Sequence, residues 1–418
     1  MRLLFLSNFY PPIHGGGYAQ LCAEVARAME ANGHTVGILT SNYQRSQAPL
    51  QEKNIYRLLH LEGDLFYYRP LKFLLRGQKQ KQENSAALRQ TVQKFKPDLI
   101  FVWGMWMLSL DQPALCEQLL PSRVVYYLAG QWPALSDVNV AYWSHPAHRW
   151  FMRWPKQLLS KIVLPSGTVH EVSVLKFDHV LCVSQALREN LIQQGLPFTR
   201  AKVVHNGIQV TQFCRENDAK ERFCQGKLRL LYAGQVAQHK GVHTIIDAMS
   251  LLKPELEAKR IDLTILGGGH PAYRARLDQT IEADRLGKYI SFCDKVPREA
   301  MVGWLHQFDV LLFPSIYEEP LARIVQEAMA AGLVVVGTLT GGTKEILVDG
   351  ENGLVFPAEN TAVLANQIAQ LIDDPDLCWR LAQAGCETVQ QKFTIAQMIA
   401  EIEKYLQKVF QNANSIPN

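Results

Sequence analysis

Two glutamates separated by seven residues mark the segment with the clearest chemical content, FPSIYEEPLARIVQEAMAAG at 313–332. Apolar residues follow helical spacing after Pro320, which suits a first helical turn, and Gly332 suits a C-terminal cap. We therefore expect Glu319 at the mouth of a helix and Glu327 about two turns inside it. If the whole stretch is helical, the two residues lie about 12 Å apart along the axis.

This separation does not suit two-carboxylate hydrolysis of a sugar, which needs carboxyl groups roughly 5–9.5 Å apart. It suits an elongated ligand with hydroxyls at both ends and an anion in the middle, because the N–H groups of a helix N-terminus bind anions. A sugar–diphosphate–ribose molecule has this layout. In the plainer interpretation Glu319 balances the helix dipole and Glu327 is solvated. However, Glu327 falls between core positions Ile324 and Ala328.

Two further segments are candidates for phosphate binding. In LYAGQVAQHKG (231–241), Lys240 precedes an expected helix and offers a compact positive charge. In GGTKE (341–345), successive N–H groups can form an anion nest, and Glu345 is expected to begin a helix. Each segment also has a plainer interpretation: a surface lysine beside a turn in the first, a flexible turn in the second.

A third glycine-rich segment, PPIHGGG at 11–17, follows the first expected strand and permits close approach of the backbone to a ligand. It lacks a clean G-x-G-x-x-G spacing, and the second expected strand closes as Leu39-Thr40-Ser41 without an acidic residue. A nicotinamide-dependent enzyme is therefore disfavoured.

Short apolar runs alternate with longer amphipathic stretches in both halves of the chain. Strands are expected at Leu3–Ser7, Thr35–Thr40, Leu99–Trp103, Val124–Leu128, His179–Ser184, Leu228–Ala233, Leu263–Leu266, Ile290–Phe292, Val310–Phe313 and Val334–Gly337. Continuous apolar strands of this kind indicate parallel sheets covered on both faces. We predict an α/β protein with two Rossmann-like, doubly wound domains that face each other across a cleft. Ligands of such sheets bind beyond the carboxyl ends of the strands.

The expected boundaries follow from breaks in this apolar rhythm. Residues 1–208 are expected to form an N-terminal Rossmann-like domain, and residues 209–394 a C-terminal Rossmann-like domain. Residues 395–418 form a charged amphipathic helix that is expected to pack back on the N-terminal domain.

Composition sets the class of protein. The 418 residues are 48% hydrophobic and 20% charged, which excludes a disordered chain. A net charge of +4 is too small to indicate nucleic acid as the partner. Eight scattered cysteines without a C-x-x-C pair exclude a zinc ribbon and a disulfide scaffold. No apolar run approaches the roughly 20 residues of a membrane span. These features predict a cytoplasmic enzyme.

With Glu319-x7-Glu327 followed by Ala-Met-Ala-Ala-Gly, the sequence resembles the retaining GT-B-fold glycosyltransferases of family 4 (glycosyl transferases group 1). The resemblance covers nearly the whole chain. It implies that the N-terminal domain, residues 1–208, lies on the acceptor side and that the C-terminal domain, residues 209–394, binds the nucleotide-sugar. It implies that Glu319 contacts hydroxyls of the donor sugar and that Glu327 holds the ribose hydroxyls. Leu321 and Ala322 fall where the family often has Phe-Gly, whose backbone lies against the sugar and the diphosphate.

The same resemblance assigns the phosphate contacts. Lys240 matches a family cation that binds the donor diphosphate, but Gln235 replaces the arginine that accompanies it. We hypothesise that Arg323 partly replaces this arginine. The resemblance also implies that Gly16 and Gly17 close over the donor.

Two further positions complete the comparison with the family pattern. Gly342 and Thr343 match its Gly-Gly-x-x-Glu, which favours the anion-binding interpretation of that turn. Ala129 stands where many members carry a histidine near the reacting centre. Either another residue such as Gln131, His14 or His145 substitutes for it, or activity is altered.

The resemblance implies transfer with retention, without a metal ion and without a cofactor, from a nucleotide-sugar substrate to a hydroxyl of a glycan, glycolipid or small molecule. Glu319 and Lys240 are the expected catalytic residues. The leaving diphosphate is stabilised by Lys240, helix N–H groups and loop glycines. Its own oxygen can accept the proton of the acceptor.

Aromatic and cationic residues alternate in two segments of the N-terminal half, 66–76 and 149–161. They resemble a patch for peripheral membrane contact, which would suit a lipid-linked acceptor. Packing of the aromatics into the core is an equally open interpretation. Two alternatives to the transferase also remain: a nucleotide-sugar epimerase of the same fold, and a catalytically weak donor-binding partner subunit, which Ala129 and Gln235 favour.

Overall fold

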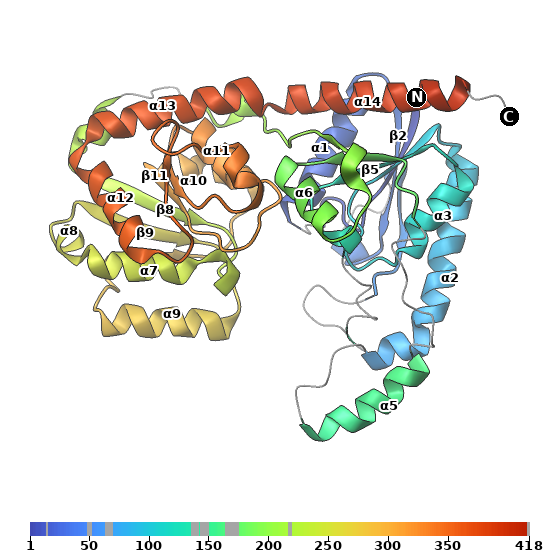
Figure 1. Ribbon diagram of the computed structural model, residues 1–418, viewed down its shortest axis with the longest axis horizontal. Helices are drawn as coiled ribbons and strands as arrows, with labels where there is room; N and C mark the ends of the chain where they lie inside the picture. Colours follow the sequence, from blue (N-terminus) through green and yellow to red (C-terminus); the bar gives the residue numbers. More distant parts are fainter. Residues whose placement is uncertain are drawn as a thin grey trace. The chain divides into compact units, whose positions relative to one another are not determined.

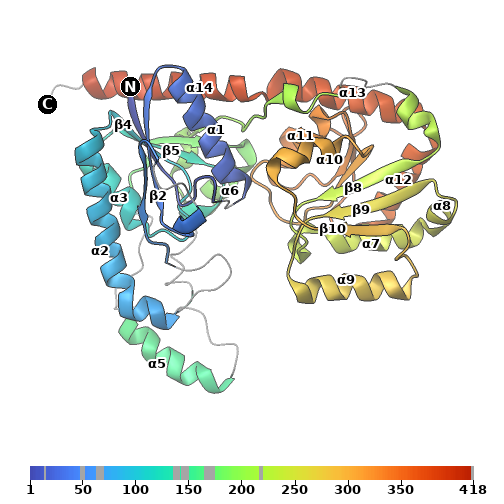
Figure 2. The ribbon, with the colours of Figure 1, turned by 180° about the vertical axis from the view of Figure 1, so that it is seen from behind.

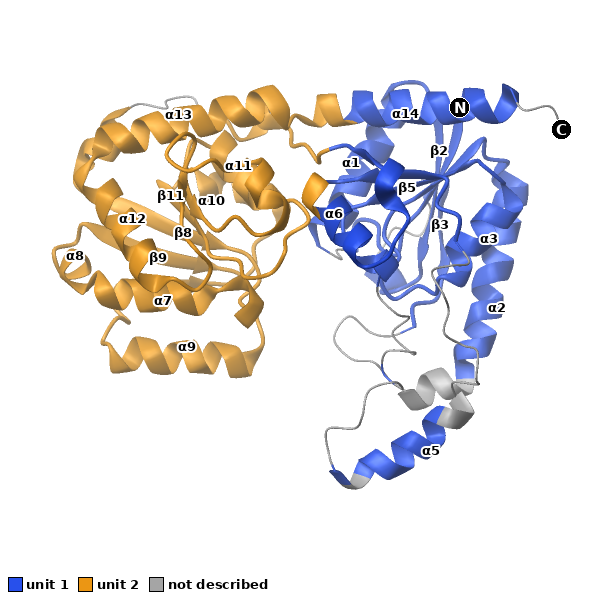
Figure 3. Ribbon diagram, in the orientation of Figure 1, with its two compact units in different colours: residues 1–183, 187–204, 399–418 blue, residues 184–186, 205–398 orange. Residues whose placement is uncertain are grey.

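The computed structural model describes residues 1–13, 16–47, 52–62, 70–134, 142, 150–163, 175–215 and 220–415. The chain forms two compact units (Figure 3). Unit 1 comprises residues 1–183, 187–204 and 399–418, and unit 2 comprises residues 184–186 and 205–398. The sequence-based boundaries lay at 208/209 and 394/395.

Unit 1 is built on a seven-stranded parallel sheet in the order β3-β2-β1-β4-β5-β6-β7. Its strands are β1 (Arg2–Leu6), β2 (Thr35–Ser41), β3 (Ile55–Leu59), β4 (Leu99–Val102), β5 (Val124–Leu128), β6 (His179–Cys182) and β7 (Lys202–Val203). Every residue of β4 and β5 is buried, because both faces of the central strands are covered.

The helices of unit 1 are α1 (Gly17–Ala31), α2 (Pro70–Phe95), α3 (Asp111–Leu119), α5 (Arg153–Val163) and the larger parts of α6 (Gln185–Gln193) and α14 (Ile395–Ser415). Helix α14 lies beside the N-terminus of the chain (Figures 1 and 2). Its Glu403 accepts a 2.7 Å hydrogen bond from the Asn32 side chain and pairs with His34 at 2.9 Å. Glu401 pairs with Lys202 at 2.8 Å. These contacts fix α14 to the turn between α1 and β2 and to β7.

Unit 2 contains a six-stranded parallel sheet in the order β10-β9-β8-β11-β12-β13. The strands are β8 (Leu228–Ala233), β9 (Ile261–Leu266), β10 (Ile290–Cys293), β11 (Val310–Phe313), β12 (Val334–Gly337) and β13 (Leu354–Val355). Its helices are α7 (Val242–Leu251), α8 (Lys253–Glu257), α9 (Pro271–Ala283), α10 (Met301–Leu305), α11 (Arg323–Ala330), α12 (Thr361–Asp373) and α13 (Pro375–Lys392). Helix α9 lies along α7 in both views (Figures 1 and 2).

The α/β class with two parallel sheets is confirmed, and all ten predicted strands are present with ends that shift by at most two residues. Three strands were missed: β3, β7 and β13. Strand β3 carries Arg57 within its apolar run, and the other two have two residues each, too few to produce a readable pattern.

A buried carboxylate joins two central strands of unit 2. Asp309, immediately before β11, is fully buried and accepts hydrogen bonds of 2.9 Å from the Arg229 backbone N–H, Nε and Nη2. Arg229 lies in β8, which pairs with β11. The ion pair therefore fixes the register of the strands whose opposite ends carry the candidate site.

Replacing Asp309 with alanine is expected to lower the free energy of unfolding by about 3 kcal/mol, because it removes a buried charge partner and the acceptor of a backbone N–H. Urea unfolding followed by circular dichroism measures this loss. Asp262→Ala is the control: it breaks the half-exposed Lys227–Asp262 pair and should cost only about 0.5 kcal/mol. Equal losses in the two variants would contradict a structural role for the Asp309 pair.

Candidate active site

Three neighbouring strands of unit 2 deliver most of the predicted site residues. Strands β8, β11 and β12 are adjacent and parallel, so the loops that follow them start at the same edge of the sheet. The β8 loop carries Lys240, the β11 loop carries Glu319, and the β12 loop carries Gly342 and Thr343. Their convergence follows directly from the strand order.

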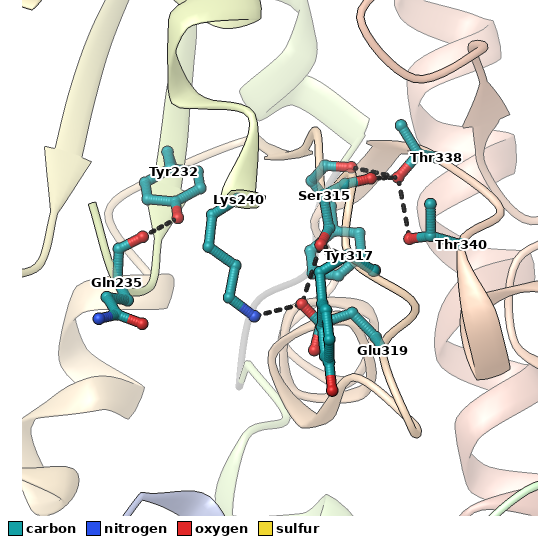
Figure 4. Close-up of polar contacts among 9 residues, drawn as sticks. Tyr232, Gln235, Lys240, Ser315, Tyr317, Glu319, Thr338 and Thr340 are labelled. Carbon is teal, nitrogen blue, oxygen red and sulfur yellow. Dashed lines mark hydrogen bonds and ion pairs between the residues drawn. The ribbon is translucent and has the colours of Figure 1, made fainter. Parts of the chain in front are cut away.

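An ion pair between Lys240 and Glu319 joins the β8 loop to the β11 loop in this site. Lys240 Nζ donates to Glu319 Oε1, and the Ser315 hydroxyl donates to the same oxygen at 2.9 Å (Figure 4). The side chains of Lys240 and Glu319 are 22% and 13% exposed. Lys240 Nζ also lies 5.5 Å from the centre of the Tyr317 ring. The carboxylate is thus oriented by two donors from two loops.

The two loops approach each other so closely that one position requires glycine. The carbonyl of His239 accepts 3.0 Å hydrogen bonds from the N–H groups of Ile316 and Tyr317. Gly241 follows with φ +70°, and a Cβ there would lie 2.0 Å from the Pro314 carbonyl oxygen. Gly241 therefore permits the contact that brings Lys240 to Glu319.

The β12 loop supports Glu319 from its other side. The Gly342 N–H donates to the Glu319 carbonyl at 2.7 Å, and the Thr343 N–H donates to the Thr340 carbonyl at 3.1 Å. The Thr338 hydroxyl donates to the Ser315 carbonyl at 2.7 Å (Figure 4). Because the Gly342 and Thr343 amides already donate within the protein, their role as an anion nest gains no support from this geometry.

Helix α11 begins at Arg323, so the prediction of a helix that starts around Pro320 is wrong. The hydrogen bond from Gly342 to the Glu319 carbonyl holds the preceding residues outside the helix, and Ala322 is an extended N-cap. The 12 Å axial estimate therefore does not apply. The predicted C-terminus is confirmed: Gly332 follows the helix with φ +73°.

Glu345 was expected to begin a helix, which is also wrong, because it ends the short 3-10 helix at Gly341–Glu345. Its carboxylate pairs with His205 at 2.8 Å and accepts the N–H groups of Gln185 and Ala186. Burial alone would raise the pKa of Glu345, but His205 and the two amides lower it below its usual value. Glu345 is thus a structural anion of unit 2.

Glu327 lies one turn inside α11 and is almost completely buried, with a side chain that is 2% exposed. Arg298 Nη2 donates to Glu327 Oε1, and Arg323 Nε lies 3.6 Å from the same oxygen. The sequence analysis did not single out Arg298. Its only signal was a position shortly after the apolar run of β10.

The remaining predicted residues have plainer surroundings. Leu321 and Ala322 are buried, and Gln235 is exposed while its carbonyl accepts a 2.6 Å hydrogen bond from the Tyr232 hydroxyl (Figure 4). Gly16 and Gly17 belong to unit 1, where Gly16 precedes α1 with φ +104°. His14 and His145, considered as substitutes for the histidine that Ala129 replaces, lie outside the described residues.

Two family profiles together match most of the chain. The profile described as Glycosyl transferases group 1 matches residues 214–388, and the profile described as Glycosyltransferase Family 4 matches residues 15–212. The chain belongs to these glycosyltransferases. This assignment favours glycosyl transfer over the epimerase alternative.

Individual relatives of this glycosyltransferase are distant but extend over its whole length. The chain is 24% identical to glycogen synthase of Mycobacterium tuberculosis over 417 residues, which cover 96% of this chain and 94% of that one. Sucrose-phosphate synthase of Thermosynechococcus elongatus superposes with a TM-score of 0.72 at 20% identity, covering 98% and 99% of the two chains. The Anabaena protein HepE, in complex with UDP and glucose, gives 0.69 at 18% identity over 97% and 99%. These structures confirm the GT-B fold.

In the described part of the glycosyltransferase chain, no group of three or more His, Cys, Asp or Glu side chains gathers as metal ligands would. Asp373 pairs with Arg260, and Asp374 caps the N-terminus of α13. Among the described helices, none is both long and apolar enough to cross a membrane.

The turn at Gly341 offers a direct test of this geometry. Gly341 has φ +54°, and a Cβ there would lie 2.1 Å from the Glu319 carbonyl oxygen. Gly341→Ala is therefore expected to break the Gly342–Glu319 hydrogen bond and to lower the free energy of unfolding by about 2–4 kcal/mol. Thermal unfolding measures the loss.

The matched control is Gly268→Ala, since a Cβ at Gly268 meets nothing within 4 Å. This variant should unfold within about 0.5 kcal/mol of the wild type. If Gly341→Ala were as stable as Gly268→Ala, the close approach of the β12 loop to Glu319 would be contradicted.

Proposed function

We propose that this glycosyltransferase moves a sugar, with retention of anomeric configuration, from a nucleotide-diphosphate-sugar to a hydroxyl acceptor. The observation that carries the proposal is the Lys240–Glu319 pair at the carboxyl ends of adjacent strands, with Ser315 holding the carboxylate. A cation for a diphosphate and an acceptor for sugar hydroxyls lie side by side there. The UDP and glucose bound by the Anabaena neighbour support this class of donor.

In the proposed reaction the bound donor separates the Lys240–Glu319 ion pair and gives each side chain a new partner. Lys240 turns to the diphosphate, and Glu319 accepts hydrogen bonds from the sugar. The acceptor oxygen bonds to the anomeric carbon while the bond from that carbon to the diphosphate oxygen breaks. The acceptor's proton passes to that diphosphate oxygen, so the products are a glycoside and a nucleoside diphosphate. Lys240 stabilises the charge that develops on the leaving group, and the scheme includes no metal ion.

Arg323 keeps its proposed part as a second cation near the diphosphate, in place of the family arginine at Gln235. Its position at the first residue of α11 supports this role, because anions bind near helix N-termini. Its Nε also lies 3.6 Å from Glu327 Oε1, beside the carboxylate that is proposed to hold the ribose hydroxyls.

A panel of UDP-, GDP- and ADP-sugars tests the donor site through thermal stability. A donor at one hundred times its dissociation constant should raise the free energy of unfolding by about 2.7 kcal/mol. Lys240→Met should lose most of this gain, because it removes the cation for the diphosphate. The control is Lys408→Met, since Lys408 is exposed on α14, and it should retain the gain.

Product analysis of the isolated protein completes this test. NMR of the anomeric proton of the product should show the configuration of the donor sugar. Donor binding without any product would instead favour the alternative of a catalytically weak partner subunit. Absence of stabilisation by every nucleotide-sugar would contradict the proposed donor site.

We also propose that the enzyme contacts an anionic membrane surface and uses a lipid-linked acceptor. Trp150, Trp154 and Leu158 recur every four residues in and before α5 and are 80%, 77% and 59% exposed. These two tryptophans are therefore not packed into the core, in contrast to the alternative interpretation of this segment. Arg153 and Lys156 lie in the same helix, which gives it the mixture of aromatic and cationic side chains typical of interfacial helices. Residues 66–69 of the other predicted segment lie outside the described residues.

Flotation with liposomes tests the membrane proposal. Wild-type protein should float with vesicles that contain phosphatidylglycerol and much less with pure phosphatidylcholine, because cations add to apolar insertion. The double variant Trp150→Gln/Trp154→Gln should stay at the bottom of the gradient. Trp379→Gln, at an exposed tryptophan of α13, is the control and should float normally. Wild-type protein that does not float with either vesicle would contradict the proposal.

A further inference from the structure

We infer that Arg298 is a positioning residue that holds the Glu327 carboxylate for two ribose hydroxyls, and that the enzyme therefore selects ribonucleotide over 2′-deoxyribonucleotide donors. The inference rests on the proposed donor site and adds to it a residue and a substrate class. Arg298 opens the short 3-10 helix Arg298–Ala300 that follows β10.

The first step is the electrostatic state of Glu327. A carboxylate that is only 2% exposed has lost most of its hydration, which is costly unless a cation compensates it. Arg298 supplies this cation from another loop, 29 residues away in the sequence. An ionised carboxylate only accepts hydrogen bonds, and this is the state that a pair of hydroxyl donors requires.

The second step is orientation. Within the described part of the chain, Nη2 of Arg298 donates to Oε1 of Glu327, and Nε of Arg323 lies 3.6 Å from the same oxygen. A carboxylate has about four lone-pair sites, so these two contacts leave capacity to accept from a diol. The two ribose hydroxyls are neighbours on one ring face and donate in one direction, which a carboxylate fixed at one oxygen can match.

The third step is how Arg298 itself is held. Its guanidinium carbon lies 5.5 Å from the centre of the buried Phe213 ring. The Phe213 carbonyl contacts His306 Nε2 at 2.7 Å, and Arg215 Nη2 donates to the carbonyls of Leu305 and Phe308 at 3.0 and 2.6 Å. The segment 213–215, which contacts Arg298, is thereby hydrogen-bonded to the C-terminal end of α10, the helix that follows Arg298 in the chain. Arg298 is 31% exposed, so one side of it still faces solvent.

Selectivity for ribose follows from these contacts. A 2′-deoxyribose offers one hydroxyl instead of two and leaves part of a buried carboxylate without a donor. Sites that are built to bind a hydroxyl reject analogues that lack it for this reason. Sugar donors that carry a deoxyribonucleotide should therefore bind more weakly than their ribose counterparts.

The experiment compares a ribonucleoside diphosphate with its 2′-deoxy form by calorimetry, using the base that stabilises the wild-type enzyme. Wild-type protein should bind the ribose form about tenfold to hundredfold more tightly. Arg298→Met should weaken the ribose form by a similar factor and leave the deoxy form within about twofold, so that selectivity is lost. Arg298→Lys should restore part of it. KM for the donor should rise while kcat changes little, since the contact is the same in the ground and transition states.

Arg276→Met, at an exposed arginine of α9, is the matched control and should keep the wild-type selectivity. If Arg298→Met bound both nucleotides more weakly by the same factor, Arg298 would be a structural residue only. If Arg298→Met bound the ribose form more tightly than the wild type, Arg298 would block access to Glu327. Either result overturns the inference while the donor site stands. If wild-type protein binds neither nucleotide, the proposed function fails and the inference fails with it.

Discussion

The ion pair between Lys240 and Glu319 joins two loops that are 79 residues apart in the sequence. Each loop adapts its backbone to make this contact: Gly241 takes a positive φ so that the lysine loop can reach Pro314, and Gly341 does the same so that the β12 loop can reach the Glu319 carbonyl. The requirement for glycine therefore arises from contact between loops and applies before any ligand binds. The position of α11, and with it that of Glu327, depends on the same arrangement.

The sequence predicted this fold well where a single stretch of chain determines the structure. Buried parallel strands are continuous apolar runs, so β8, β11 and β12 were located together with the edge at which Lys240 and Glu319 meet. The predicted start of α11 was wrong because propensity favoured Pro320, whereas a hydrogen bond from the Gly342 N–H to the Glu319 carbonyl holds that segment outside the helix. Arg298 was missed for a related reason: its partner is distant in sequence, and a single arginine after a strand has no distinctive pattern.

Unit 2 contains two acidic side chains that are buried in different ways. Asp309 is satisfied by one arginine of the neighbouring strand through three hydrogen bonds, which leaves it little capacity for anything else. Glu327 is compensated at one oxygen by arginines from a loop and from its own helix. The first arrangement suits a stabilising contact at the amino ends of β8 and β11. The second retains accepting capacity at the edge of the sheet that carries the proposed donor site.

The pairing of Lys240 with Glu319 also bears on how a catalytic cycle would end. Glu319 acts as an internal counter-ion, so the lysine carries an anion whether or not a diphosphate is present. On the proposed reaction, a departing nucleoside diphosphate is replaced at Lys240 by a carboxylate that is already in place, and the bare cation never has to be rehydrated. In the proposed scheme this exchange moderates product inhibition, because Glu319 competes with the nucleoside diphosphate for the charge of Lys240.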